Sequence, residues 1–322
     1  MDLHTLGSEL LRALRGRRSQ VAFSRRLGFR SNVAHAWETG RRYPDAPDVW
    51  QAARALGLPV DLNLTRFFGG EPGPGVDPGT ADGTAALLRH LRREQPIADL
   101  AAAAGRSRHQ VSRWLNGVAI PRLPDWLAMV DACTRRVLDW IAIFVDPASL
   151  PSAAEAWERL EAARTLLLTA PHAQVVLVAT DLDAYRALPA HDDRWLARLL
   201  GLEVWEVAGA IDRLVHAGLL ERQGPSYAPA VAATVDTRRH PDTGRALKVY
   251  WAEAVRRRLD APGASVSTNV FTVSAADHQR ILELYRNTFR QMRAIVAASA
   301  PAERVVLIQQ ALIPLADPRA GE

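Results

Sequence analysis

Apolar side chains near the N-terminus recur at the spacing of a short helix. Ser19 is a favoured N-cap residue, and Phe23 and Leu27 follow it on one helical face. Gly28 comes next, and glycine readily adopts the left-handed conformation that ends a helix. The pattern therefore predicts a helix over residues 19–27 that stops at a glycine turn.

A second helix is predicted directly after this turn, over residues 31–38. Ala34 and Trp37 lie three positions apart and therefore share one face of it. Gly40 ends the helix, and a further helix is expected over residues 48–56. Two short helices joined by a glycine turn, with apolar residues on their inner faces, form a helix-turn-helix motif.

The same landmarks occur a second time, 77 positions further along the chain. The repeat predicts helices over residues 83–93 and 96–104, and then a helix that Ser107 caps, with Val111 and Trp114 facing inward. The paired landmarks are Gly28 and Gly105, Trp37 and Trp114, Gly40 and Gly117, Pro44 and Pro121, and Asp48 and Asp125. The chain therefore carries two copies of one structural unit.

The composition is that of an ordinary globular protein. The 322 residues are 48% hydrophobic and 23% charged, and no apolar run reaches the roughly 18 residues of a membrane helix. A single cysteine, Cys133, excludes a disulfide framework and a cysteine metal cluster. The N-terminal segment lacks the layout of a signal peptide. We expect a cytoplasmic protein with no membrane contact, metal or cofactor.

Positive charge is concentrated in the two repeated units. Residues 1–68 hold 11 Arg and 6 acidic residues, and residues 84–124 hold 7 Arg and 2 acidic residues. Residues 151–322 are balanced, with 20 basic and 20 acidic residues. Of the 40 basic residues 39 are Arg, whose planar fork can donate two parallel hydrogen bonds to phosphate. A GC-rich genome would also favour Arg over Lys, but it would not explain the clustering.

Both units resemble the Cro and phage-repressor type of helix-turn-helix, also called the xenobiotic-response-element type. The shared features are the turn glycine, the inward Trp of the second helix, the later glycine and the proline beyond it. The resemblance implies that outward residues of each second helix enter the major groove of DNA: Ser31, Asn32, His35 and Ala36 in the first copy, and Arg108, His109, Gln110, Ser112 and Arg113 in the second. It also implies a phosphate contact for Gln20, where the second copy has Ile97. The second copy has Leu115 in place of the more usual Glu38.

The outward faces of the two copies differ in chemistry. Arg108 and Arg113 can each donate two hydrogen bonds to guanine, whereas Asn32 can bind adenine. Ser107, at the start of the second recognition helix, is assigned to the same interface. The first copy has more cations for phosphate, namely Arg25, Arg26, Arg30, Arg41 and Arg42. We therefore expect the first copy to position the protein and the second to specify the sequence. The alternative is that one copy only packs and never touches DNA.

The sequence predicts two heads, a linker and a C-terminal domain. Their expected bounds are 1–68, 69–82, 83–150 and 151–322. Residues 69–83 hold three prolines and six glycines and almost no apolar residue, so we expect a linker outside any core. A flexible linker of about 15 residues would allow the two heads to bind adjacent turns of one duplex.

The C-terminal domain is expected to be helical, which makes the fold mainly α. Helices are predicted over residues 152–169 and 172–187, although residues 172–180 alone could also form a strand. Residues 188–230 have the pattern of a winged-helix-like unit: a helix, a glycine turn, a second helix and a two-stranded wing. The second helix of this unit carries an acidic face that phosphate would repel, so we expect a structural or dimerisation role. That face carries three acidic residues, Glu203, Glu206 and Asp212, and one basic residue, Arg213.

Two further elements are predicted beyond this unit. Residues 265–274 alternate like a strand, and Ser274 and Asp277 form a capping signature for a helix to about residue 298. Its apolar stripe would be a core or an oligomer seam, and less often a ligand pocket; the stripe is formed by Ile281, Tyr285, Met292 and Val296. Residues 155–318 resemble a C-terminal domain of unknown function that follows helix-turn-helix heads in some bacterial regulators.

Together these patterns favour a sequence-specific DNA-binding transcription regulator, with repression favoured over activation. Its expected partners are double-stranded DNA, a second copy bound through the C-terminal domain, and an unknown effector or protein partner. An enzyme is not expected, because the acid–histidine clusters at residues 191–193 and 238–242 lack the spacing of a metal site or an acid–base pair. The alternative is a protein–protein adaptor or antitoxin-like module whose heads only autoregulate. RNA binding is less favoured, because no aromatic stacking platform is evident.

Overall fold

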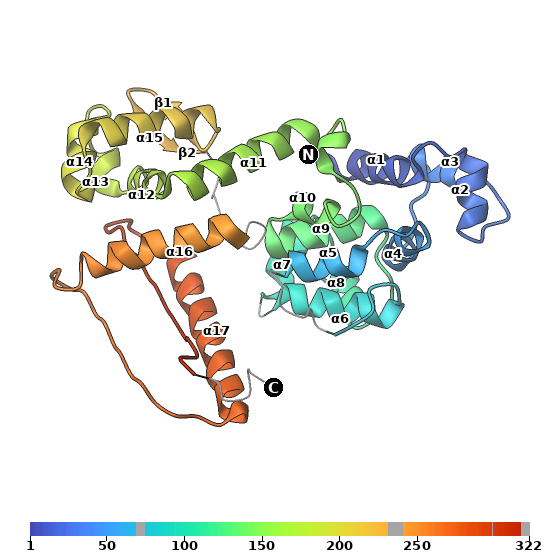
Figure 1. Ribbon diagram of the computed structural model, residues 1–322. Helices are drawn as coiled ribbons and strands as arrows, with labels where there is room; N and C mark the ends of the chain where they lie inside the picture. Colours follow the sequence, from blue (N-terminus) through green and yellow to red (C-terminus); the bar gives the residue numbers. More distant parts are fainter. Residues whose placement is uncertain (69–74, 94, 231–240, 298, 317–322) are drawn as a thin grey trace. The chain divides into compact units, whose positions relative to one another are not determined.

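The chain forms two compact units, unit 1 (Met1–Glu161) and unit 2 (Ala162–Glu322), in the computed structural model shown in Figure 1. The structure describes residues 1–68, 75–93, 95–230, 241–297 and 299–316. The boundary between the units falls inside α11 (Ala154–Thr169), whereas the sequence placed it at residue 150. Each unit has its own buried apolar cluster, and residues of α11 belong to both clusters.

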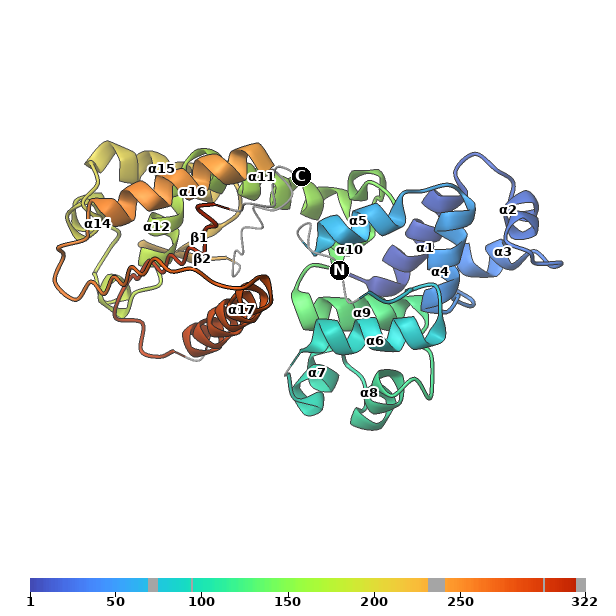
Figure 2. The same ribbon diagram turned by 60° about the horizontal axis from the view of Figure 1, so that its bottom comes forward.

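Unit 1 is helical and contains both copies of the repeat. Head 1 comprises α1 (Leu3–Arg15), α2 (Gln20–Arg26), α3 (Val33–Glu38), α4 (Ala46–Ala55) and α5 (Val60–Phe67). Head 2 comprises α6 (Ala81–Arg92), α7 (Ile97–Ala103), α8 (Arg108–Leu115), α9 (Leu123–Thr134) and α10 (Val137–Ile141), and a 3-10 turn (Pro147–Ser149) follows it. Figure 2 shows α2–α3 and α7–α8 projecting from separate ends of unit 1, with α1, α4, α6 and α9 between them.

The predicted motif helices are present, with small shifts in their ends. Ser19 caps α2 and Ser107 caps α8, as the sequence indicated. The recognition helix of head 1 was expected from residue 31, but α3 begins at Val33. The reason is that Asn32 is its N-cap: the Asn32 side chain accepts a hydrogen bond from the backbone N–H of His35.

Several backbone hydrogen bonds are equivalent in the turns of the two heads. Equivalent backbone hydrogen bonds run from Phe29 to Ser24 and from Arg106 to Ala101, and likewise from Gly40 to Trp37 and from Gly117 to Trp114. Gly28 and Gly105 have positive φ angles of 85° and 62°. These left-handed positions suit glycine, so the spacing of the glycines fixes the same turn twice.

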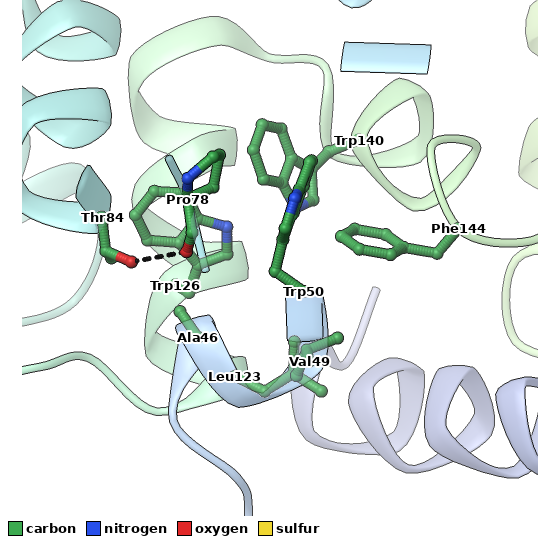
Figure 3. A pocket seen from close by; sticks show the side chains of 9 residues that line it. All are labelled: Ala46, Val49, Trp50, Pro78, Thr84, Leu123, Trp126, Trp140 and Phe144. Atoms are coloured by element: carbon green, nitrogen blue, oxygen red, sulfur yellow. Dashed lines mark hydrogen bonds between the residues drawn. The ribbon is translucent and has the colours of Figure 1, made fainter. Parts of the chain in front are cut away.

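The two heads also share one core, which differs from the expected pair of tethered domains. The Trp50 ring of head 1 lies 5.8 Å from that of Trp140 and 5.0 Å from that of Phe144, both in head 2. Pro78, in the predicted linker, is buried beside these rings in a small pocket, and its carbonyl accepts a hydrogen bond of 3.1 Å from the Thr84 hydroxyl (Figure 3). Apolar side chains from both heads therefore form a single cluster.

Polar contacts hold the described part of the predicted linker against head 1. Arg54 Nη1 donates to Asp77 Oδ1 at 2.6 Å, and Gln51 Nε2 donates to the carbonyl of Gly79 at 2.5 Å. Helix α6 begins at Ala81, inside the predicted linker. The expectation of a linker outside any core is therefore wrong for Asp77–Gly79, because side chains of α4 bind this segment. Residues 69–74 of the linker lie outside the described residues.

Unit 2 begins with the end of α11 and is also mainly helical. It comprises α12 (Pro171–Ala179), α13 (Asp183–Arg186), α14 (Asp193–Leu200), α15 (Val204–His216), β1 (Leu220–Gln223), β2 (Ser226–Pro229), α16 (Pro241–Arg256) and α17 (Ala275–Ala297). Strands β1 and β2 pair antiparallel, with Leu220 opposite Pro229. A helix, a glycine turn, a second helix and a hairpin thus follow in the predicted order.

Two predictions for unit 2 are wrong. The helix expected over residues 172–187 is divided into α12 and α13, where the Thr180 hydroxyl bonds back to the carbonyl of Leu177 at 2.7 Å. Residues 265–274 form no strand, and their side chains are exposed, because no other described segment pairs with them. The capping prediction for α17 is confirmed: Ser274 Oγ accepts a hydrogen bond of 3.0 Å from the Asp277 N–H.

Among the described residues, no single helix is both long and apolar enough to cross a membrane. Helices α11 and α12 satisfy that criterion only when taken together, and they meet at an angle of 108°.

Candidate nucleic-acid interface

The recognition helix of head 2 presents a polar face of four exposed side chains. Val111 and Trp114 hold α8 to the core, with exposed fractions of 0% and 4%. Residues on the opposite side of the helix therefore point outward. The exposed residues are Arg108, His109, Gln110 and Arg113, and Ser112 is half-buried. Ser107 Oγ is occupied at the helix start, where it accepts a hydrogen bond of 3.2 Å from the Gln110 N–H.

The recognition helix of head 1 is shorter and less basic. Ala34 and Trp37 are buried at 0% and 4%, which matches the pair in α8. Ser31, Asn32 and His35 are exposed, and Ala36 is half-buried. The Asn32 side-chain oxygen accepts hydrogen bonds from the His35 N–H and from Ser24 Oγ, each at 3.4 Å. Its amide nitrogen therefore remains for a base, while its oxygen is engaged in capping.

Cations flank the recognition helix of head 1 on both sides. Arg30 precedes α3, and Arg41 and Arg42 follow it, and all three are exposed. Arg25 is exposed as well, whereas Arg26 donates to the carbonyl of Ala55 at 2.9 Å. Exposed guanidinium groups around a recognition helix are suited to bind the phosphates on either side of a groove.

A buried glutamate, which the sequence analysis noted only as a family residue, fixes the end of α3. Glu38 is 6% exposed and pairs with Arg15 Nε of α1 at 2.5 Å. Gln20 Nε2 donates to the same carboxylate at 2.9 Å, and Arg12 lies at 4.0 Å. The structure thus places Gln20 against Glu38, half-buried, and its contact with phosphate stays a prediction. The signal available in the sequence was the basic last turn of α1.

Head 2 fixes the equivalent point without a carboxylate. Leu115 occupies the position of Glu38 and is 3% exposed, and Arg89 Nη1 donates to its backbone carbonyl at 2.5 Å. Arg106 holds the turn of head 2 by pairing with Asp125 Oδ1 at 2.6 Å. Asp125 was expected as a landmark of the repeat, but the role of Arg106 was not expected from the sequence, because its partner lies in α9.

The charge of Glu38 should contribute to the stability of unit 1. Burial alone would raise its pKa, but hydrogen bonds from Arg15 and Gln20 and the charges of Arg15 and Arg12 outweigh burial, so the pKa of Glu38 is lowered. A carboxyl whose pKa is lower in the folded state stabilises the fold above its unfolded pKa. That contribution is lost as the pH falls through the folded pKa.

We therefore expect Glu38→Gln to lower the free energy of unfolding by about 1–3 kcal/mol at pH 7, and by less at pH 3. Urea unfolding of the full chain at the two pH values measures this difference. Glu155→Gln, whose side chain is 79% exposed, is the control and should change the stability little at either pH. An equal loss for Glu38→Gln at both pH values would show that the charge of Glu38 contributes nothing.

The acid–histidine clusters that were considered as catalytic sites have structural contacts where the structure describes them. Asp192 caps α14, and its side chain accepts hydrogen bonds from the N–H groups of Arg194 and Trp195. His191 lies between the Tyr185 hydroxyl and Asp193 Oδ1, at 2.8 Å from each. Of the second cluster, residues 238–240 and the side chains of residues 241 and 242 lie outside what the structure describes.

Comparison with known families agrees with this architecture. The family described as a helix-turn-helix domain matches twice, over residues 8–64 and 85–135. A family described as a domain of unknown function, DUF4423, matches residues 152–315. Comparisons with curated proteins and with solved structures gave no match. The two helix-turn-helix domains indicate a DNA-binding regulator, and the chain belongs to the DUF4423 family, whose domain here follows two helix-turn-helix heads.

Proposed function

We propose that this protein is a sequence-specific transcription regulator of the cytoplasm, more suited to repression than to activation and without catalytic activity. The main support for this proposal is the pair of recognition helices, each held by a buried Trp and each presenting exposed polar side chains. Arg108 and Arg113 are both exposed on α8, from which side chains can reach base edges in a major groove. A regulator that occupies a promoter in this way would obstruct transcription.

This proposal predicts salt-dependent binding of the full chain to duplex DNA. Each phosphate that an arginine neutralises releases a counterion, so log K should fall linearly with log salt, with a slope of about −0.9 per phosphate. Fluorescence anisotropy of a labelled duplex selected by the protein, titrated at several salt concentrations, measures the slope. Binding that does not change with salt, or that is equal for the selected duplex and a scrambled duplex, would contradict the proposal.

We further propose that unit 2 binds a second copy of the chain. Its described surface exposes apolar side chains on α17 and beyond, including Leu284 at 67%, Ile295 at 69% and Ile313 at 68%. Unit 2 holds 19 basic and 17 acidic residues, so two copies would repel each other only weakly through net charge. Exposed apolar area of this kind marks an interaction surface.

Sedimentation of the full chain tests this association. We expect a dimer at micromolar concentration, and Ile295→Glu and Leu284→Glu to shift the population towards the monomer. An effector or another protein could also use this surface. A wild-type chain that sediments as a monomer would contradict the homodimer.

A further inference from the structure

The loops that follow the two recognition helices are joined by a reciprocal pair of backbone hydrogen bonds. The Ala46 N–H donates to the Pro121 carbonyl at 3.0 Å, and the Leu123 N–H donates to the Pro44 carbonyl at 3.0 Å. Between them, Asp45 and Arg122 form an isolated antiparallel bridge.

These two bonds connect equivalent positions of the repeat in both directions. Pro44 and Pro121 are separated by the repeat offset of 77, and so are Ala46 and Leu123. In each bond the donor is Ala46 or its counterpart Leu123, and the acceptor is the proline of the other head. Reciprocal contacts of this kind characterise a two-fold, isologous interface between identical subunits.

The helices on either side of the bridge also make reciprocal contacts between the two heads. Helix α1 of head 1 packs on α9 of head 2, and α6 of head 2 packs on α4 of head 1. In the repeat, α6 is the counterpart of α1 and α9 is the counterpart of α4. The reciprocity therefore extends from the backbone bridge into the shared core, and it relates the two heads by an approximate two-fold axis near Asp45 and Arg122.

This arrangement constrains where the recognition helices can lie. Helix α3 ends at Glu38 and α8 at Leu115, so each ends seven residues before the bridge. Seven residues span at most about 25 Å, which places the two helix ends within roughly 50 Å of each other. The 34–36 Å repeat of successive major grooves on one face of B-DNA lies inside this limit.

We propose that a single chain binds an inverted repeat with two unlike half-sites. This inference rests on the proposed function and names the class of duplex that the interface takes. A two-fold axis in the protein matches the two-fold axis of an inverted repeat, whereas a direct repeat would present one half-site in the wrong orientation. The half-sites differ because head 2 presents Arg108 and Arg113 where head 1 presents Ser31 and Ala36.

Selection of duplexes from a random library by the full chain gives the first test. The enriched site should contain two different half-sites in inverted orientation, with centres about 10–11 base pairs apart. Five base pairs inserted between the half-sites should weaken binding roughly 10- to 100-fold, because one head would then face the wrong side of the helix. Inversion of one half-site should have a similar effect.

A grafted chain gives the second test. The outward face of α8 is transferred to α3 while the buried Ala34 is kept, using the substitutions Arg30→Ser, Ser31→Arg, Asn32→His, Val33→Gln, His35→Ser and Ala36→Arg. The substitution at residue 30 supplies the capping serine that α8 has in Ser107. This chain should select a perfect palindrome of the half-site that wild-type head 2 prefers.

The outcomes separate the two proposals. Failure of the wild-type chain to enrich any site would contradict the proposed function itself. An enriched site with one half-site, with two in direct orientation, or with affinity unchanged by the five-base-pair insertion would overturn the two-fold arrangement and leave DNA binding intact. The insertion series uses the wild-type chain, so its result does not depend on folding of the grafted one.

Discussion

Replacement of Trp50 by Ala is expected to lower the free energy of unfolding of unit 1 by about 3–5 kcal/mol. Trp50 is 1% exposed, and its ring packs against Trp140 and Phe144. Its removal leaves a cavity at the point where head 1 meets head 2, and neighbouring side chains in a close-packed core fill such a cavity only in part.

The loss of stability should affect both heads, because they share this core. Hydrogen exchange of the full chain should show the amides of α3 and of α8 losing protection together, although Trp50 belongs to head 1 alone. Trp205→Ala in unit 2 is the matched control; this side chain is 73% exposed, so its loss should change the stability by less than about 0.5 kcal/mol. Loss of protection in α3 with full protection in α8 would show that the heads fold independently.

The combined substitution Arg108→Ala and Arg113→Ala should have the largest effect on DNA binding. Each arginine can donate two hydrogen bonds to a guanine, worth about 1–3 kcal/mol of discrimination, so the pair should cost about 2–6 kcal/mol on the selected duplex. The loss on a scrambled duplex should be much smaller. Neither side chain contributes to the core, so the stability of the chain should be kept.

Arg41→Ala separates base contacts from phosphate contacts. Arg41 is exposed beyond the end of α3, and its loss should weaken binding to all duplexes alike and reduce the salt slope by about one. Arg280→Ala, on α17 with a side chain that is 82% exposed, is the charge control and should leave binding unchanged. Equal, sequence-independent losses from Arg41, Arg108 and Arg113 would contradict the assignment of base contacts to α8.

The sequence predicted local structure well where a single residue type is needed. Positive φ at Gly28 and Gly105, and the inward Trp37 and Trp114, are requirements of one turn and one helix face. Such features repeat at a fixed spacing and need no knowledge of distant parts of the chain. The exposed residues of α8 followed from the same reasoning, since inward and outward faces are set by helical periodicity.

The relation between the two heads could not be predicted in this way. The bridge that joins them is formed by backbone groups of Pro44, Ala46, Pro121 and Leu123. Nearly every residue has the same backbone N–H and C=O groups, so the sequence does not show which of them pair. The glycines and prolines before Thr80 suggested a tether, yet Pro78 is buried against side chains from both heads. The strand expected over residues 265–274 was wrong for a related reason, because an alternating pattern predicts a strand only when a partner strand is present.

The central claim is that this chain is a sequence-specific DNA-binding protein whose two heads act together. A hydroxyl-radical footprint of the full chain on its selected duplex tests this claim most directly. We predict that each bound chain protects two segments on one face of the DNA, with centres about one helical turn apart, both appearing at the same protein concentration. In the Arg108→Ala and Arg113→Ala chain both segments should disappear together at that concentration. Uniform protection along the duplex, or no protection at concentrations where the duplex is bound, would contradict the account.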